Sequence, residues 1–322
     1  MTTEGMQAAV LAAPQRIDIN SVRLPLPGPH DVRVRLEGCG ICTSNLPVWE
    51  GRPWFTYPLA PGAPGHEGWG YIDAVGAEVQ GLTYGDRVAL LSSHAYAQYD
   101  VTPAHDVVAL PAALDGKPFP GEPLGCAMNI LQRSNIQSGQ SVAIIGMGFL
   151  GLLLATLATQ AEARVIAISR RVFALAIAQQ FGAEAALLLT HQRQVIEQVK
   201  DLTGEAGCDC VIEAVGEQAP LDLASELTRV RGRLVIAGYH QDGLRQVNMQ
   251  LWNWRGLDVI NAHERDREVA VAGMRRAVAL VASGKLDPSP LYTHMFSLEQ
   301  LPTAFTAIQQ RPTGFLKGCI TF

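Results

Sequence analysis

The chain has 322 residues, of which 48% are hydrophobic and 17% are charged, and its formal net charge is −5. This length favours two domains, and this composition excludes a disordered chain. The mildly acidic balance, with no run of Lys or Arg, argues against a nucleic-acid partner.

The termini, cysteines and apolar segments all favour a cytoplasmic protein without a membrane partner. Residues 1–10 lack a basic segment followed by an apolar one, so we expect no secretory signal. Six cysteines in a chain this long do not make a disulfide scaffold, which predicts a reducing compartment. Residues 134–161 carry no charge, but their pattern indicates strand, glycine turn and helix rather than a membrane span.

The first third of the chain has the pattern of a β-barrel. Val32–Leu36 alternates with a period of two, as a half-buried strand does. Closely spaced glycines and prolines then separate short runs, and Gly85–Ala89 is typical of a turn entering a strand. We therefore expect an all-β domain over residues 1–119.

From residue 120 onward, strands and helices alternate, which predicts a doubly wound parallel sheet over residues 120–287 and an α/β protein overall. After Asp287 the chain returns to short strands, so residues 288–322 are predicted to rejoin the first domain. The elements expected between residues 120 and 287 are Leu124–Arg133, Ser141–Ile145, Leu150–Gln160, Arg164–Ile168, Val172–Phe181, Cys208–Ala214, Leu221–Val230, Arg233–Ala237, Leu257–Asn261 and Arg267–Ser283.

A Gly-x-Gly-x-x-Gly fingerprint directly follows an apolar strand and opens a helix, which is the context that a dinucleotide site requires. Its first glycine permits the tight turn, its second lets the backbone approach the pyrophosphate, and its third lets helix and strand pack closely. The helix N-terminus then faces the phosphates. The residues expected to bind the nucleotide here are Gly146, Gly148, Phe149, Leu150 and Gly151.

The end of the next strand bears on the choice between NAD and NADP. An NAD site usually has a carboxylate there, which holds the ribose 2′-hydroxyl. This strand ends instead in Ser169, Arg170 and Arg171, whose hydroxyl and guanidinium groups suit a 2′-phosphate. The sequence therefore predicts a preference for NADP(H).

Two glycine-bounded loops of the first domain carry residues of the metal-ligand type. Cys42 follows Gly40, and His66 and Glu67 lie between Gly65 and Gly68. A thiolate and an imidazole can take two corners of a zinc tetrahedron, and a catalytic zinc needs a third protein ligand beside an open position. Two residues further along the chain could supply that third ligand, Glu122 and Cys126.

Together these motifs resemble the medium-chain dehydrogenase/reductase superfamily, in its zinc-type alcohol dehydrogenase branch. The resemblance covers nearly the whole chain, from Cys39-Gly-Ile-Cys through Gly65-His-Glu, Gly85-Asp-Arg-Val and Glu122-Pro-Leu to the fingerprint and Ala214-Val-Gly. It implies a GroES-like β domain that carries zinc, a Rossmann domain that carries the nucleotide, and an active site in the cleft between them. Homodimers or homotetramers are also expected.

The resemblance also implies roles for single residues. Cys42 and His66 match the first two zinc ligands, and Glu67 matches a carboxylate that approaches the metal. Glu122 matches the third ligand of the polyol and threonine dehydrogenase-like branch, with Cys126 as the alternative. Ser44 matches the hydroxyl that relays the substrate's proton.

Three departures from the family pattern bear on the site. Asn45 stands where the family usually has Asp, and Pro47 stands where some members have the His that ends the proton relay. Between Arg87 and Pro111 there is no cysteine, so no structural zinc is expected.

These features predict an NADP(H)-preferring enzyme with one catalytic zinc per chain. It would interconvert an alcohol or polyol and a ketone or aldehyde by zinc-assisted hydride transfer. One alternative is a zinc-free NADPH-dependent reductase of an activated C=C bond, such as an enone, a quinone or an enoyl thioester. Another is a non-catalytic nucleotide-binding protein that kept the fold.

Overall fold

The computed structural model describes residues 5–322; residues 1–4, the start of the predicted first domain, lie outside the described residues. The chain forms two compact units. One comprises the residues up to Gly125 together with Asp266–Phe322, and the other is Cys126–Arg265. The sequence-based boundaries, 119/120 and 287/288, assign helix α8 (Arg267–Ala282) to the nucleotide domain, whereas it belongs to the first unit.

The reason for the position of α8 is local. The helix packs against β7 (Val107–Ala109) and the short turn η2 (Ala104–Asp106) of the first unit. At its start, Arg267 Nε donates to a carboxylate oxygen of buried Asp106 at 2.9 Å. A buried carboxylate requires such a partner, so the ion pair ties the beginning of α8 to the β-rich unit.

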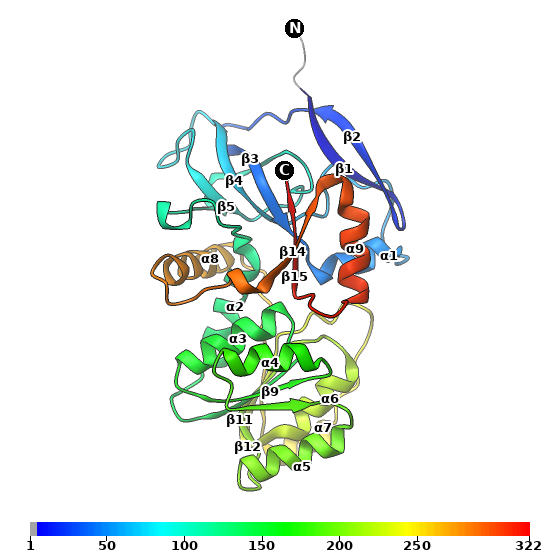
Figure 1. Cartoon of the computed structure of the whole chain (residues 1–322), viewed down its shortest axis with the longest axis vertical. Coiled ribbons are helices and arrows are strands. Elements are labelled where there is room, and N and C mark those ends of the chain that lie inside the picture. Colours follow the sequence, from blue (N-terminus) through cyan, green and yellow to red (C-terminus); the bar gives the residue numbers. More distant parts are fainter. Residues whose placement is uncertain (1–4) are drawn as a thin grey trace. The chain divides into compact units, whose positions relative to one another are not determined.

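Within the described residues, the first unit contains a two-stranded sheet, β1-β2, and a seven-stranded sheet in the order β14-β15-β3-β4-β5-β7, with β6 also paired to β3. Helix α9 packs against β14 and β15 (Figure 1). The other elements of this unit are β1 (Gly5–Ala13), β2 (Arg16–Arg23), β3 (Asp31–Gly40), η1 (Thr43–Asn45), α1 (Leu46–Glu50), β4 (Glu67–Val75), β5 (Arg87–Leu90), β6 (Tyr99–Pro103), η3 (Ala112–Leu114), η4 (Ser289–Leu291), β14 (Tyr292–Ser297), η5 (Leu298–Gln300), α9 (Leu301–Gln310) and β15 (Lys317–Thr321).

The core of this unit fills the space between its sheets and α9. It contains the inward side chains of β3, such as Val32, Val34 and Leu36, which confirms the period-two pattern predicted there. Trp49 stacks on Phe305 of α9 with ring centroids 4.9 Å apart. This packing holds the segment after β3 against helix α9.

The second unit is a doubly wound sheet with the strand order β10-β9-β8-β11-β12-β13, in which all neighbours are parallel. Helices α3 and α4 lie on one face, and α5 and α6 lie on the other (Figure 1). Helix α2 (Gly121–Ser134) leads into it, and its elements are β8 (Ser141–Ile145), α3 (Phe149–Gln160), β9 (Arg164–Ser169), α4 (Val172–Gln180), β10 (Ala185–Leu188), α5 (Gln192–Leu202), β11 (Cys208–Glu213), α6 (Gln218–Leu227), β12 (Thr228–Ile236), α7 (Met249–Arg255) and β13 (Asp258–Asn261).

The structure confirms the α/β class with a Rossmann sheet but corrects several elements. Strand β10 and helices α5 and α7 were not predicted, and the tail contains helix α9 where only short strands were expected. Helix α5 is amphipathic, but its segment is mostly polar and it fully buries only Val195 and Val199. The helix predicted to reach Val230 ends at Leu227, because Thr228 already pairs with Cys208 in the sheet.

Within residues 5–322, no helix combines the length and the apolar character that crossing a bilayer requires.

Candidate functional site

Strand pairing brings the two ligand-type loops together. In the antiparallel pair β3 and β4, Gly40 lies opposite Glu67. The chain that leaves β3 therefore emerges beside the chain that enters β4, which places Cys42 next to His66. The ligand atoms of Cys42, His66 and Glu67 all lie within 4.8 Å of one another.

Cys42 precedes a short 3-10 turn, and its carbonyl accepts a hydrogen bond from Asn45 N at 3.1 Å. Ser44 lies half-buried in the same turn. The turn continues directly into helix α1, which has Pro47 in its first turn. The proline thus lies in the first turn of a helix, where its fixed φ and its missing N–H are tolerated.

Glu67 is wholly buried and forms an ion pair with Lys317, which lies 250 residues away in the sequence. Lys317 Nζ donates to Glu67 Oε1 at 2.7 Å and to the carbonyl of Ile41 at 3.0 Å. Burial lowers the pKa of Lys317, but the charges of Glu67, Cys42 and Cys319 outweigh it and hold the pKa above its ordinary value. The lysine is therefore a fixed cation behind the carboxylate.

Gly40 makes room for this ion pair. A Cβ at Gly40 would lie 1.8 Å from Glu67 Oε2 and 3.1 Å from Lys317 Cε. Oε2 lies 2.5 Å from Lys317 Nζ but is not aligned to accept a hydrogen bond from it. A buried carboxylate oxygen of this kind has lone pairs to offer a cation.

The charges around His66 favour its protonated form when no metal is bound. Burial lowers the pKa of His66, but the hydrogen bond with Cys42 and the charges of Cys42, Glu122 and Glu67 raise it overall to about 10. Anionic groups that attract a proton to an imidazole also attract a metal cation to the same place.

Neither proposed third ligand belongs to the close cluster. Among the described residues, the group within 4.8 Å contains Cys42, His66 and Glu67. Glu122 lies in the first turn of α2, near enough for its charge to act on His66. Cys126 is half-buried one turn further along the helix and falls in the second unit.

The donor set fits zinc. Bonds of about 2.3 Å to sulfur and about 2.0–2.1 Å to nitrogen bring tetrahedral ligand atoms to roughly 3.5 Å from one another. Separations within 4.8 Å need only small side-chain adjustments to reach this geometry. A thiolate, an imidazole and carboxylates are the ligand types that zinc takes in proteins.

Sequence reasoning missed two residues of this site, Lys317 and Tyr96. Tyr96 is buried, and its hydroxyl donates to Asn45 Oδ1 at 2.8 Å. Burial raises the pKa of Tyr96 well above its ordinary value, so the hydroxyl keeps its proton. The available signal for Lys317 was a lone cation in a strongly apolar final strand, since a buried lysine needs a partner.

The fingerprint of the second unit forms the predicted turn. Gly146 has φ +102, and a Cβ there would lie 2.6 Å from Val215 Cγ2. A Cβ at Gly151 would lie 1.8 Å from the Gly146 carbonyl oxygen, so only glycine lets α3 pack this closely. Gly148, the N-cap residue of α3, has open space beside its Cβ direction. That space, at the positive end of a helix that includes Phe149 and Leu150, suits a phosphate.

The residues predicted to select the nucleotide lie at the turn from β9 to α4. Ser169 is buried, and its Oγ accepts a hydrogen bond from Arg171 N at 3.1 Å. Arg170 is exposed, whereas Arg171 is half-buried, with its guanidinium carbon 5.1 Å from the ring centroid of Phe173. The turn therefore presents one exposed arginine and one half-buried arginine.

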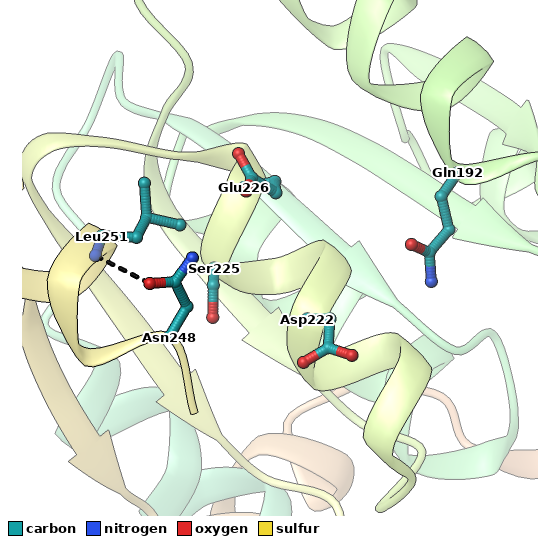
Figure 2. A pocket seen from close by; sticks show the side chains of 6 residues that line it. All are labelled: Gln192, Asp222, Ser225, Glu226, Asn248 and Leu251. Carbon is teal, nitrogen blue, oxygen red and sulfur yellow. Dashed lines mark hydrogen bonds between the residues drawn. The ribbon is translucent and has the colours of Figure 1, made fainter. Parts of the chain in front are cut away.

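A pocket of about 240 Å³ in the second unit is lined by residues of α5, α6 and α7 (Figure 2). Asn248 Oδ1 accepts from Leu251 N at 3.0 Å on one side of it. Asp222 and Glu226 both line the pocket, so it repels rather than attracts the phosphates of a nucleotide. The glycine turn remains the candidate cofactor site.

Sequence models of two domain families match the chain. The alcohol dehydrogenase GroES-like domain matches residues 28–112, and the zinc-binding dehydrogenase family matches residues 150–278. The GroES-like match lies in the first compact unit, and the zinc-binding dehydrogenase match lies in the second except for residues 266–278; together they cover more than half of the chain.

Known relatives are similar over almost their whole length. Sorbitol dehydrogenase of Halalkalibacterium halodurans is 26% identical, with 88% of this chain and 90% of that protein aligned. Human sorbitol dehydrogenase is 26% identical over 94% of this chain and 92% of its own. Erythritol/L-threitol dehydrogenase of Mycolicibacterium smegmatis is also 26% identical, over 92% of each chain.

Solved structures show the same fold. A zinc-binding dehydrogenase of Sinorhizobium meliloti bound to NADP superposes with a TM-score of 0.86 at 25% identity, over 99% of this chain and 100% of the other. An alcohol dehydrogenase from Thermus sp. ATN1 gives 0.83 at 26% identity, over 98% and 99% of the two chains.

Proposed function

Because the chain belongs to the zinc-type alcohol dehydrogenase-like branch of the medium-chain dehydrogenase/reductase superfamily and is an oxidoreductase, we propose a specific reaction for it. It interconverts an alcohol or polyol and the corresponding ketone or aldehyde, with one catalytic zinc per chain and NADP(H) as the preferred cofactor. The cluster of Cys42, His66 and Glu67 is the observation that carries this proposal.

The protein side of the chemistry is assigned to few residues. Bound zinc would supply Lewis-acid polarisation of the substrate oxygen, and the nicotinamide would supply or take the hydride. Cys42 and His66 would hold the metal, with Glu122 as the third ligand and Cys126 as its alternative. Ser44, in the turn beside Cys42, would pass the substrate's proton to or from water.

Glu67 would be a carboxylate held close to the bound metal. Lys317 balances the charge of Glu67 and holds its Oε1 by a hydrogen bond. The carboxylate is therefore stable in a buried place, where an unpaired charge would be costly.

Two observations support NADP(H). The turn after β9 carries Arg170 and Arg171 and no carboxylate, and a relative of similar fold was solved with NADP. An acidic residue at this turn would instead repel a 2′-phosphate.

We also propose a homodimer that forms through strand β13. This strand ends the described sheet, and edge strands readily pair with a second copy. On the preceding helix α7, Trp254 is 86% exposed and Met249 is 53% exposed. The second copy would cover these two apolar side chains in such an assembly.

Elemental analysis of protein purified without chelator tests the proposal. About one zinc per wild-type chain and none in Cys42→Ala are expected. The zinc-loaded protein should oxidise polyols or secondary alcohols with NADP⁺ faster than with NAD⁺. Failure to bind zinc even after reconstitution would remove the metal from the proposal, and the assay would then move to enones and other activated C=C bonds.

A further inference from the structure

The hydroxyl of Tyr96 orients the side chain of Asn45. It donates to Asn45 Oδ1 at 2.8 Å, and both residues are buried. A phenol that keeps its proton offers a donor, so it selects the oxygen of the amide and not its nitrogen. The Asn45 Nδ2 group must consequently point the other way.

Asn45 Nδ2 points toward the His66 loop. It donates to the carbonyl of Pro64 at 3.3 Å and lies 3.4 Å from His66 Nδ1. His66 Nδ1 itself lies 3.0 Å from the same carbonyl. The shorter contact assigns the Nδ1 proton to a hydrogen bond with Pro64, which leaves Nε2 as the nitrogen for a metal.

The backbone around Tyr96 is attached directly to that loop. Tyr96 N donates to the Gly62 carbonyl and Ala95 N donates to the Gly65 carbonyl, both at 3.0 Å. A Cβ at Gly65 would lie 2.5 Å from Tyr96 N, so the close approach requires glycine. The Tyr96 ring also packs edge-on against Phe305, with centroids 6.0 Å apart.

We propose that Tyr96 is a positioning residue of the metal site, which acts through Asn45 to hold His66 with Nε2 available for zinc. The inference rests on the proposed zinc site. A neutral phenol–amide pair here does the orienting that a carboxylate does in many metal sites. Residues 92–96, which contain no cysteine, thus serve the catalytic site by direct contact with its loop.

The test measures zinc affinity by competition with a chromophoric chelator. Tyr96→Phe keeps the ring and removes the hydroxyl, and it is expected to weaken zinc binding about tenfold, the lower end for loss of an orienting partner. Asn45→Ala should weaken binding to a similar extent. In the Asn45→Ala background, Tyr96→Phe should then change the affinity less than twofold, because its effect passes through the amide.

Three further tests separate positioning from general stability. The visible bands of the cobalt-substituted protein, which report the geometry around the metal, should shift in Tyr96→Phe. Tyr57→Phe is the matched control, since it also removes a hydroxyl that bonds a carbonyl, that of Val48 in α1, and it should leave zinc affinity unchanged. Asn45→Asp should tighten zinc binding, because a carboxylate can accept from both Tyr96 and His66 Nδ1.

An affinity for Tyr96→Phe within twofold of wild type would overturn the inference, as would an equal loss in the Asn45→Ala background. If Tyr96→Phe does not fold, the Asn45 variants decide, and an unchanged affinity in Asn45→Ala would refute the assigned path. Absence of zinc from the wild-type protein would be a different result, since it would contradict the proposed function itself.

Discussion

Glu67 has a cation on one side and two ligand-type side chains on the other. Lys317 holds it by a buried ion pair, while Cys42 and His66 lie within 4.8 Å of it. Neither the glutamate nor the lysine could be buried alone at acceptable cost. The folded protein is therefore expected to need both partners of the ion pair, and Glu67 is also expected to take part in the reaction.

Replacing Lys317 by Met should destabilise the protein by about 3–5 kcal/mol, because Glu67 then keeps a buried charge with no counterion. Urea denaturation of the metal-free protein measures this. The double variant Lys317→Met with Glu67→Gln should recover most of the loss. Equal stability of the single variant and wild type would show that the ion pair is not needed to bury the carboxylate.

Ser44→Ala should lower kcat about 100-fold, the lower range for loss of a positioned proton-transfer group, without weakening NADPH binding. Steady-state kinetics and a fluorescence titration of NADPH measure the two effects. Thr43→Ala, which changes the exposed neighbouring hydroxyl, is the matched control. An unchanged kcat in Ser44→Ala would remove this residue from the proton path.

At the scale of elements, the turn between β9 and α4 combines a buried hydroxyl with two arginines. Replacing both Arg170 and Arg171 by Ala should raise the Kd for NADPH about tenfold or more, because a hydrogen bond to a charged group contributes about 1.5–3 kcal/mol. The Kd for NADH should stay within twofold. Calorimetric titration with both cofactors measures this, and a parallel loss for both would refute phosphate recognition by this turn.

Strand β11 contains two buried thiols, which make the stability of the folded protein depend on pH. Burial raises the pKa of Cys208 and of Cys210 from 9.0 to about 12. The folded state therefore keeps protons that the unfolded chain loses above pH 9, so this contribution to stability is complete below pH 9 and is lost as the pH rises toward 12.

Between pH 8 and pH 10.5, wild type should lose more unfolding free energy than a variant with both thiols replaced by Ala. The difference should be about 2 kcal/mol or more, since one pKa unit corresponds to about 1.4 kcal/mol. Urea titrations at the two pH values provide the comparison. Parallel losses in both proteins would mean that other groups carry the alkaline sensitivity.

At the scale of the whole molecule, assembly is expected to depend on the exposed face of α7 and on strand β13. Trp254→Glu places a charge on the most exposed aromatic of α7 and should convert a homodimer to a monomer. Light scattering coupled to size-exclusion chromatography measures the mass. Trp54→Glu, at an aromatic that is 58% exposed in the first unit, serves as the control and should leave the mass unchanged.

Most of what the amino-acid sequence determined by itself came from local motifs. The glycines of the fingerprint predicted the turn between β8 and α3, because Gly146 has a positive φ and a Cβ at Gly151 would collide with the Gly146 carbonyl oxygen. The alternation of strands and helices predicted the parallel sheet, and the loops around Cys42 and His66 predicted metal-ligand chemistry. Helix α5, whose segment is mostly polar, was not predicted, and the stability of such a helix depends mainly on packing of its narrow apolar face.

Only the tertiary structure decided which distant residues complete the candidate site. Lys317 reaches Glu67 because β15 pairs with β3 and β3 pairs with β4 in one register, and no local pattern specifies that register. Tyr96 reaches Asn45 because the backbone of residues 95–96 bonds to the loop before His66. Side chains far apart in sequence meet through strand pairing and packing, so only the fold shows which of them contact the candidate metal ligands.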